Sequence, residues 1–275
     1  MQRDYEITKK EMLEALNRSG YLLESEISKM LADFGFFIES NQVIKDPNSG
    51  KSREIDLIAE YYNYEKETTS YKTASKIKFV IEIKNNLFPI VILTKREFSP
   101  NIEDLPGLKE ALTIPDNIEY EWYESYYDRL IKNTDRIFTQ YCSFNKKREN
   151  DELMALHPDI IHEGLSKITQ CCEEMLKLWN KDLLDDSIYI DYEYFRHFLY
   201  MPVLLINDEL FEFNDNKLYQ VDSSILVYNY HFNNEPKMAY VFIVTKKGCP
   251  KFIESMIKSE SEVKQKMINI KNGVA

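Results

Sequence analysis

Three charged residues that could bind a cation and a phosphate lie in two short apolar segments of this 275-residue chain. Asp56 belongs to residues 52–59, and Glu82 and Lys84 belong to residues 79–84. Each segment is typical of a half-buried strand, and residues two apart on a strand point to the same face. Charged groups gathered on one sheet face are costly unless they are paired or bind a ligand. A magnesium ion held by carboxylates beside a phosphate would offset this cost.

Each of these residues also has a simpler interpretation when it is considered alone. Asp56 is typical of a solvated strand face, because Asp is mostly exposed in proteins. Glu82 and Lys84 could form a surface ion pair, which contributes little to stability. If the two segments pair as strands about 4.8 Å apart, however, Asp56 and Glu82 can share one cation. A structural protein whose charged strands face solvent is the alternative.

The order of these segments resembles that of the PD-(D/E)XK nuclease superfamily, also called restriction-endonuclease-like. The matching pieces are Gly20-Tyr-Leu-Leu-Glu24 on an expected helix, Arg53-Glu-Ile-Asp56 on a hairpin strand, and Glu82-Ile-Lys84 on the next strand. The resemblance covers roughly residues 15–95. The proline that the family has before its Asp is replaced by Ile55.

This resemblance implies a fold, an activity and a set of residue roles. The fold would be an α/β restriction-endonuclease-like core, a mixed central sheet flanked by helices. The activity would be phosphodiester hydrolysis by a Mg2+-dependent (or Mn2+-dependent) endonuclease, with DNA favoured over RNA as the substrate. Asp56 and Glu82 would hold the metal, helped by the backbone carbonyl of Ile83. Lys84 would orient the water and stabilise the phosphate, and Glu24 would contact the metal or its waters. A relative that keeps the fold and binds nucleic acid or protein without cutting is the alternative.

Two helix carboxylates compete for the role that the resemblance gives to Glu24. On a helical wheel, Glu24 lies about 75° from the centre of the apolar stripe, and Glu26 lies about 85° from it on the other side. Periodicity therefore does not choose between them. The resemblance favours Glu24, because the family often shows glycine, an aromatic residue and then this Glu.

Further candidates lie in the second half of the chain. Gln140 is expected on a helix after the core, either near the site or at the helix surface. Lys146, Lys147 and Arg148 form a basic cluster that could contact a phosphate backbone. A solvated run of loop charges is the alternative interpretation of this cluster, and the one that we favour.

Periodicity and turn signals predict the elements that must position these residues. Apolar residues at helical spacing predict a helix that ends at a glycine, and the turn Asp46-Pro-Asn-Ser-Gly50 predicts a hairpin. For the first hundred residues we expect a helix over 6–34, strands over 36–44, 52–62 and 78–84, a polar loop over 63–76, and a strand or buried connector over 87–93.

The remainder of the chain predicts helices followed by strands. Residues 1–100 are expected to form the nuclease-like core, and residues 101–275 are expected to form an elaboration packed on it in one continuous unit. In that elaboration we expect an irregular segment over 101–118, helices over 119–144, 159–180 and 251–268, and strands over 201–206, 210–213, 225–231 and 238–245.

The formal charge of −11 argues against broad nonspecific binding to nucleic acid. The acidity is concentrated in the second half, and the candidate site lies in the nearly neutral first hundred residues. Acidic residues gather in 103–128 and 182–193, so a basic protein partner is a further possibility.

The cysteines and the hydropathy of the chain indicate which cellular compartment the protein belongs to. The four cysteines form no C-x-x-C pattern, so the sequence gives no zinc site and is typical of free thiols in a reducing compartment. No apolar run is long enough to span a membrane, and the N-terminus does not resemble a signal peptide. We therefore expect a cytoplasmic protein with no membrane partner.

Overall fold

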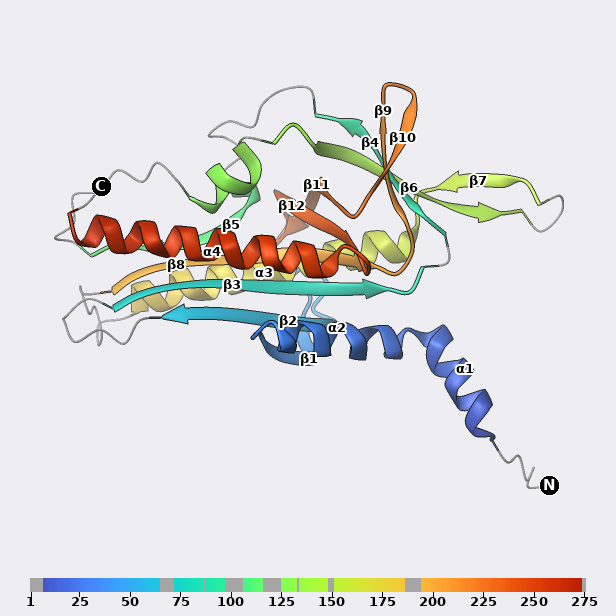
Figure 1. Ribbon diagram of the computed structural model, residues 1–275, viewed down its shortest axis with the longest axis horizontal. Helices are drawn as coiled ribbons and strands as arrows, with labels where there is room; N and C mark the ends of the chain where they lie inside the picture. The colour runs from blue at the N-terminus through green and yellow to red at the C-terminus, as the bar shows by residue number, and fades with distance from the viewer. Residues whose placement is uncertain are drawn as a thin grey trace.

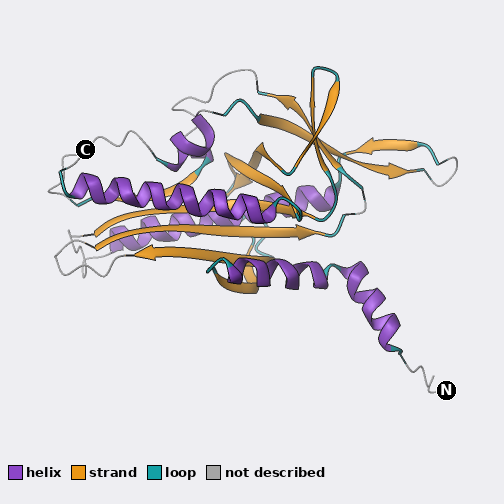
Figure 2. Ribbon diagram, viewed as in Figure 1, coloured by secondary structure: helices purple, strands orange, loops and turns teal. Residues whose placement is uncertain are grey.

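A computed structural model gives the fold and describes residues 7–64, 72–86, 88–96, 106–115, 125–132, 134–147, 151–185 and 194–273. A large mixed sheet forms the middle of the molecule, and helices lie on both of its faces (Figures 1 and 2). Within the described residues the strands follow the order β1-β2-β3-β8-β12-β11-β6-β4-β9-β10, with β5 paired to β8 and β7 paired to β6. The chain is therefore an α/β protein with a mixed sheet flanked by helices.

Strands from both halves of the chain build this sheet. Those of the first hundred residues are β1 (Phe37–Lys45), β2 (Ser52–Tyr64), β3 (Lys72–Lys84) and β4 (Ile90–Lys95). Later strands are β5 (Lys109–Thr113), β6 (Ile137–Lys146), β7 (Leu153–Leu156), β8 (Tyr194–Ile206), β9 (Leu210–Asn214), β10 (Lys217–Val221), β11 (Ser223–Phe232) and β12 (Glu235–Thr245). The helices are α1 (Lys9–Ser19), α2 (Tyr21–Asp33), the π-helix η2 (Asp128–Lys132), α3 (Asp159–Asp185) and α4 (Cys249–Lys271).

The predicted helix over 6–34 is interrupted at Gly20, which separates α1 from α2. Gly20 has a φ of +90°, a left-handed conformation that ends α1 and that side chains with a Cβ rarely adopt. The amide of Asn85, next to the end of β3, donates to the carbonyl oxygen of Asn17 at 2.8 Å. This break directs α2 across the hairpin while α1 extends away from the body of the molecule (Figure 1).

The predicted hairpin is confirmed, with β1 and β2 paired antiparallel. The Asp46 carboxylate accepts from the backbone N–H groups of Asn48 and Ser49 at 2.9 and 2.7 Å, which closes the turn. Strand β3 then pairs antiparallel with β2 over residues 74–81. On its other side, β3 pairs parallel with β8 along its whole length.

Alternation along β3 assigns its two faces to different helices. Phe79 and Ile81 belong to a core cluster that includes Ile27 of α2 and Ile253 of α4. Val80 belongs to a second cluster with Leu165 of α3. Helices α2 and α4 therefore cover one face of the sheet, and α3 covers the other. Glu82 and Lys84 share the face of Val80, as their spacing of two residues predicts, and Phe79 and Ile81 lie on the other face.

The predicted helix over 119–144 is confirmed only over residues 126–132 of the described part and is wrong over residues 137–144. Residues 128–132 form the short π-helix η2, and residues 137–146 form strand β6. Strand β6 pairs antiparallel with β4 and parallel with β11. Its aromatic and β-branched residues favour a strand, and pairing on both sides decides against a helix.

Other differences concern where strands begin and end. The polar loop predicted over 63–76 is shorter, because β2 runs to Tyr64 and β3 begins at Lys72. Thr73 and Ser75 are buried there because β8 pairs with this part of β3. Within the segment predicted to be irregular, residues 109–113 form β5, which pairs with β8. The short strands β7 and β10 were not predicted.

The remaining predictions agree with the fold or lie outside what is described. The segment over 87–93 contributes strand β4, and the helices predicted over 159–180 and 251–268 are α3 and α4. All four cysteines are free thiols. Among the described helices, none combines the length and hydropathy needed to span a membrane. The acidic stretch 182–193 lies largely outside the described residues, and of the stretch 103–128 the structure describes residues 106–115 and 125–128.

Candidate active site

Asp56 and Glu82 lie side by side because β2 and β3 pair antiparallel. Leu57 is paired with Ile81 across this ladder, and Asp56 and Glu82 are the next residues along their strands. Glu82 shares a strand face with Val80, which packs beneath α3. Both carboxylates therefore face the helix that covers this side of the sheet.

A backbone amide fixes the orientation of the Asp56 carboxylate. The N–H of Ile83 donates to Asp56 Oδ2 at 2.7 Å. The pKa of Asp56 is nevertheless raised, first by burial and second by the negative charge of Glu82. The hydrogen bond holds the carboxylate in place, while its surroundings disfavour its charge.

Glu82 is the most enclosed of the predicted site residues, with only 3% of its surface exposed. Lys84 lies on the same face of β3, and its Nζ is 2.6 Å from Glu82 Oε1. This is the spacing of a charge-assisted hydrogen bond. Glu82 and Lys84 therefore form a partly buried pair rather than the exposed surface pair of the simpler interpretation.

Lys167 of α3 is a further charged residue of this site, and sequence reasoning did not find it. Its ammonium contacts Glu82 Oε2 and lies 3.6 Å from Asp56 Oδ1. The Lys167 side chain is only 14% exposed. No local pattern links a lysine on a later helix to two strands far back in the sequence. The one available signal is its position beside Leu165 and Ile168, which are core residues of α3.

Gly164 lets α3 approach the charged face of β3 closely. A Cβ at this position would lie 2.9 Å from Glu82 Cγ and 3.3 Å from Lys84 Cε. Real Cβ atoms are essentially never as close as 2.9 Å to another heavy atom. The glycine therefore allows Lys167, one turn further along the helix, to reach the carboxylates.

Of the two helix carboxylates, Glu24 is the one that the electrostatics couple to this cluster. The pKa of Glu24 is raised by burial and then by the charges of Asp56, Glu54 and Glu82. Glu26 instead pairs with Lys246, and its side chain is 56% exposed. Ion pairs in the structure thus join Asp56, Glu82, Lys84 and Lys167, and Glu24 interacts with this cluster electrostatically.

The other candidates lie elsewhere. Gln140 is on strand β6, not on a helix, and its side chain accepts from Thr94 Oγ at 2.7 Å. Lys146 ends the same strand, and Lys147 pairs with Glu152 at 2.9 Å. Arg148 lies outside the described residues. Strands β8, β12 and β11 separate β6 from β3 in the sheet, so these residues are not part of the carboxylate cluster.

Two sizeable cavities do not coincide with this cluster. One of about 520 Å³ lies between β11 and the start of α4, and one of about 640 Å³ lies between β1 and α3. Neither is lined by Asp56, Glu82 or Lys84. The charged side chain of Arg136 in the first cavity is paired with Glu212. We locate the candidate site by its buried charges, because Glu82 within the sheet requires a compensating cation.

The oxygen atoms of the cluster are of the kind that magnesium prefers, carboxylates from Asp56 and Glu82 with Glu24 nearby. Asp56 and Glu82 lie side by side here, and burial and the charge of Glu82 raise the pKa of Asp56, as expected where a cation would be favoured. Among the described residues, however, no group of three or more His, Cys, Asp or Glu side chains is arranged to ligate a metal ion directly. The arrangement fits a metal held by two carboxylates, with water or substrate completing its coordination.

Comparison with protein-family models, curated proteins and solved structures found no match for this chain.

Proposed function

We propose that this protein is a Mg2+-dependent (or Mn2+-dependent) nuclease that hydrolyses phosphodiester bonds, with DNA favoured over RNA. The observation that carries the proposal is that Asp56 and Glu82, on two strands, converge on one position now held by the ammonium of Lys167. Lys84 lies beside the same carboxylate of Glu82. Two carboxylates around a cation position next to a lysine are the groups that metal-assisted phosphoryl chemistry requires.

The order of elements around the cluster also supports the proposal. Helix α2 with Glu24 precedes the β1–β2 hairpin with Asp56 and strand β3 with Glu82 and Lys84. This is the order of the restriction-endonuclease-like pattern that the sequence resembles. We therefore assign residues 21–84 to a core of that kind as part of the proposal.

The carboxylates and the lysine have separate roles in the proposed reaction. Asp56 and Glu82 would hold the metal. When bound, a divalent cation would supply polarisation of the phosphate and a lowered pKa of a coordinated water. The amide of Ile83 keeps Asp56 in position. Lys84 supplies a fixed positive charge beside the site, where it would stabilise the negative charge that develops on the phosphate. Glu24 would bind waters at the edge of the site.

The test is a cleavage assay with the full-length protein. Plasmid DNA, linear duplex, single-stranded DNA and RNA are incubated with Mg2+ or Mn2+ and with the variants D56N, E82Q and K84M. We expect the wild type to cut DNA and each variant to lose about 100-fold or more in rate, the usual cost of removing one group that stabilises transition-state charge. Circular dichroism checks that the variants remain folded.

The matched control is K95M, which removes a lysine from β4, a strand that β8, β12, β11 and β6 separate from β3 in the sheet. It should cut at the wild-type rate. Absence of metal-dependent cleavage of every substrate would overturn the proposal, and so would D56N that cuts as fast as the wild type.

One observation favours a second candidate function. The pairing of Lys84 and Lys167 with Asp56 and Glu82 balances two positive charges against two negative charges without a metal. A relative of the nucleases that binds nucleic acid or a protein partner without cutting could keep such a closed site. Nucleic-acid binding that is insensitive to Mg2+ and unaffected by D56N would favour this candidate.

A further inference from the structure

We propose that Lys167 is an exchangeable internal cation, which joins Asp56 and Glu82 in the metal-free protein and leaves them when a divalent cation binds. This inference rests on the proposed function, because it concerns the occupancy of the same carboxylates. It assigns to a residue of α3 a control over metal binding that the resemblance did not imply.

The first argument is that one oxygen atom of each carboxylate is already bound by another group. Asp56 Oδ2 accepts from the Ile83 amide, and Glu82 Oε1 accepts from Lys84. The remaining atoms are Asp56 Oδ1 and Glu82 Oε2. Lys167 contacts these two atoms. A metal that uses this carboxylate pair without breaking the other contacts must take the position of the Lys167 ammonium.

The second argument is that a metal and an ammonium cannot share this position. Magnesium ligands lie 2.0–2.1 Å from the ion, and an ammonium lies about 2.7–2.9 Å from a carboxylate oxygen. Two cations bound to the same oxygens would also repel each other at close range. Binding of one therefore excludes the other.

The third argument is that the Lys167 side chain can leave. Its ammonium is a point charge at the end of a flexible chain of four carbons, and the side chain retains 14% exposure, so solvent is close. Lys84 differs, because it contacts Glu82 at the oxygen on the other side of the carboxylate. Lys84 can therefore remain in place while the metal is bound.

This exchange predicts a weakened apparent affinity for metal. When only a fraction of the molecules has the carboxylates free, the apparent dissociation constant rises by the inverse of that fraction. A Lys167 contact that is formed in about nine of ten molecules would weaken metal binding about tenfold. Removal of the Lys167 ammonium should therefore strengthen metal binding by the same factor.

The experiment measures Mn2+ binding to the full-length, metal-free protein by the paramagnetic resonance signal of free Mn2+. We expect K167M to bind Mn2+ about tenfold more tightly than the wild type. K84M is the matched control, because it removes an equal charge from the same carboxylate without clearing the metal position, and its affinity should increase less. K167R keeps a charge at the position and should bind no more tightly than the wild type.

A second measurement uses the wild-type protein and does not depend on the folding of a variant. Lysine acetylation is followed by mass spectrometry with and without Mg2+. We expect Mg2+ to increase the labelling rate of Lys167 several-fold, because the displaced ammonium becomes accessible. Lys147, whose side chain is 42% exposed, serves as the internal control and should not change.

The outcomes separate this inference from the proposed function. If the wild type binds Mn2+ and K167M binds no more tightly than K84M, the exchange is overturned and the metal site stands. An unchanged labelling rate for Lys167 at saturating Mg2+ overturns the exchange in the same way. If neither the wild type nor any variant binds metal, the exchange and the proposed function both fail.

Discussion

Asp56 lies between groups that favour its charge and surroundings that oppose it. Burial and the nearby Glu82 raise its pKa, whereas the Ile83 amide, Lys167 and Lys84 lower it, and the net direction is upward. Between the ordinary pKa of an aspartate and this raised value, the folded protein binds more protons than the unfolded chain. The free energy of unfolding therefore falls as the pH rises through that interval.

The substitution D56N should remove this penalty in the metal-free protein. Asparagine retains an oxygen that can accept from the Ile83 amide but carries no charge. We expect D56N to be more stable than the wild type above the raised pKa of Asp56, with the gain shrinking as the pH falls through that pKa and Asp56 takes up a proton. Urea denaturation in the presence of a chelator measures the difference.

Two comparisons test this explanation. D135N is the control, because the pKa of the exposed Asp135 is lowered by Lys95, so its neutralisation should give no such gain at high pH. Saturating Mg2+ should stabilise the wild type and not D56N, since a ligand that binds only the folded state adds to its stability. A stability difference between D56N and wild type that does not change with pH would contradict the account.

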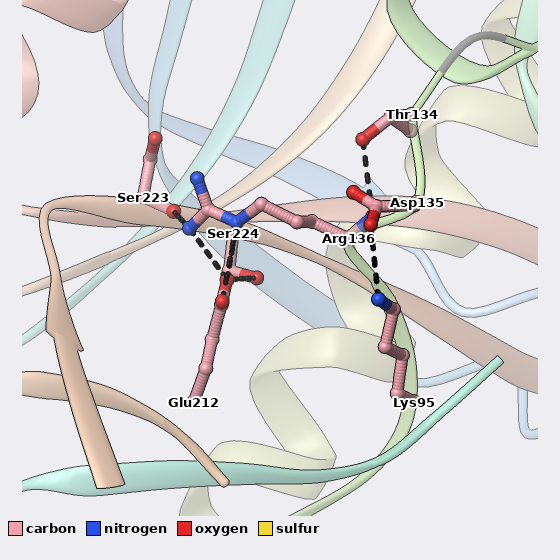
Figure 3. A network of polar contacts seen from close by, with 7 residues as sticks. All are labelled: Lys95, Thr134, Asp135, Arg136, Glu212, Ser223 and Ser224. Carbon is pink, nitrogen blue, oxygen red and sulfur yellow. Dashed lines mark hydrogen bonds and ion pairs between the residues drawn. The ribbon is translucent and has the colours of Figure 1, made fainter. Parts of the chain in front are cut away.

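At the scale of elements, one arginine joins strands of the second half of the sheet. Arg136, just before β6, binds both oxygens of Glu212 on β9, with its Nη2 2.6 Å from Glu212 Oε1 (Figure 3). Ser224 of β11 donates to the same oxygen at 2.6 Å. Glu212 is buried, so its charge depends on these partners.

We expect R136A to lower the free energy of unfolding by about 1–3 kcal/mol, because it leaves the Glu212 carboxylate buried with one neutral donor. The neighbouring pair of Lys95 and Asp135, also shown in Figure 3, is the control. The Asp135 side chain is 82% exposed, so K95A should cost less than about 1 kcal/mol. Chemical denaturation compares the two, and equal losses would contradict the argument.

At the scale of the whole molecule, the sheet separates two cores with buried thiols in each. Cys171 and Cys172 of α3 belong to the core on one face, and Cys249 of α4 belongs to the core on the other. Burial raises the pKa of Cys171 and of Cys249 to about 12. These thiols are therefore protonated and enclosed in the native protein, and both features suppress their reaction.

In native protein we expect a thiol-specific disulfide reagent to modify the partly exposed Cys142 and to leave the other three cysteines intact. Increasing urea should expose Cys171, Cys172 and Cys249 in one transition if the two cores unfold together. Mass spectrometry after pulsed labelling identifies the modified residues. Labelling of Cys249 well before Cys171 would show that the face covered by α4 opens separately.

Local signals in the sequence predicted much of the framework of the candidate site. The alternation over residues 78–84 separates Glu82 and Lys84 from Phe79 and Ile81, and the structure has the same separation. The turn at residues 46–50 and the helices over 159–180 and 251–268 also have strong local patterns. Strand β6 was predicted to be a helix, because its pairing with β4 and β11 depends on residues far away in the chain.

What the sequence by itself determined is which residue types share a face of each element, since that follows from the local periods of strands and helices. Only the tertiary structure decided which charges meet. Pairing of β2 with β3 placed Asp56 beside Glu82, and the close approach of α3 at Gly164 brought Lys167 to both. These contacts arise from packing between segments distant in sequence, so no local pattern could have predicted that Lys167 lies where a metal would bind.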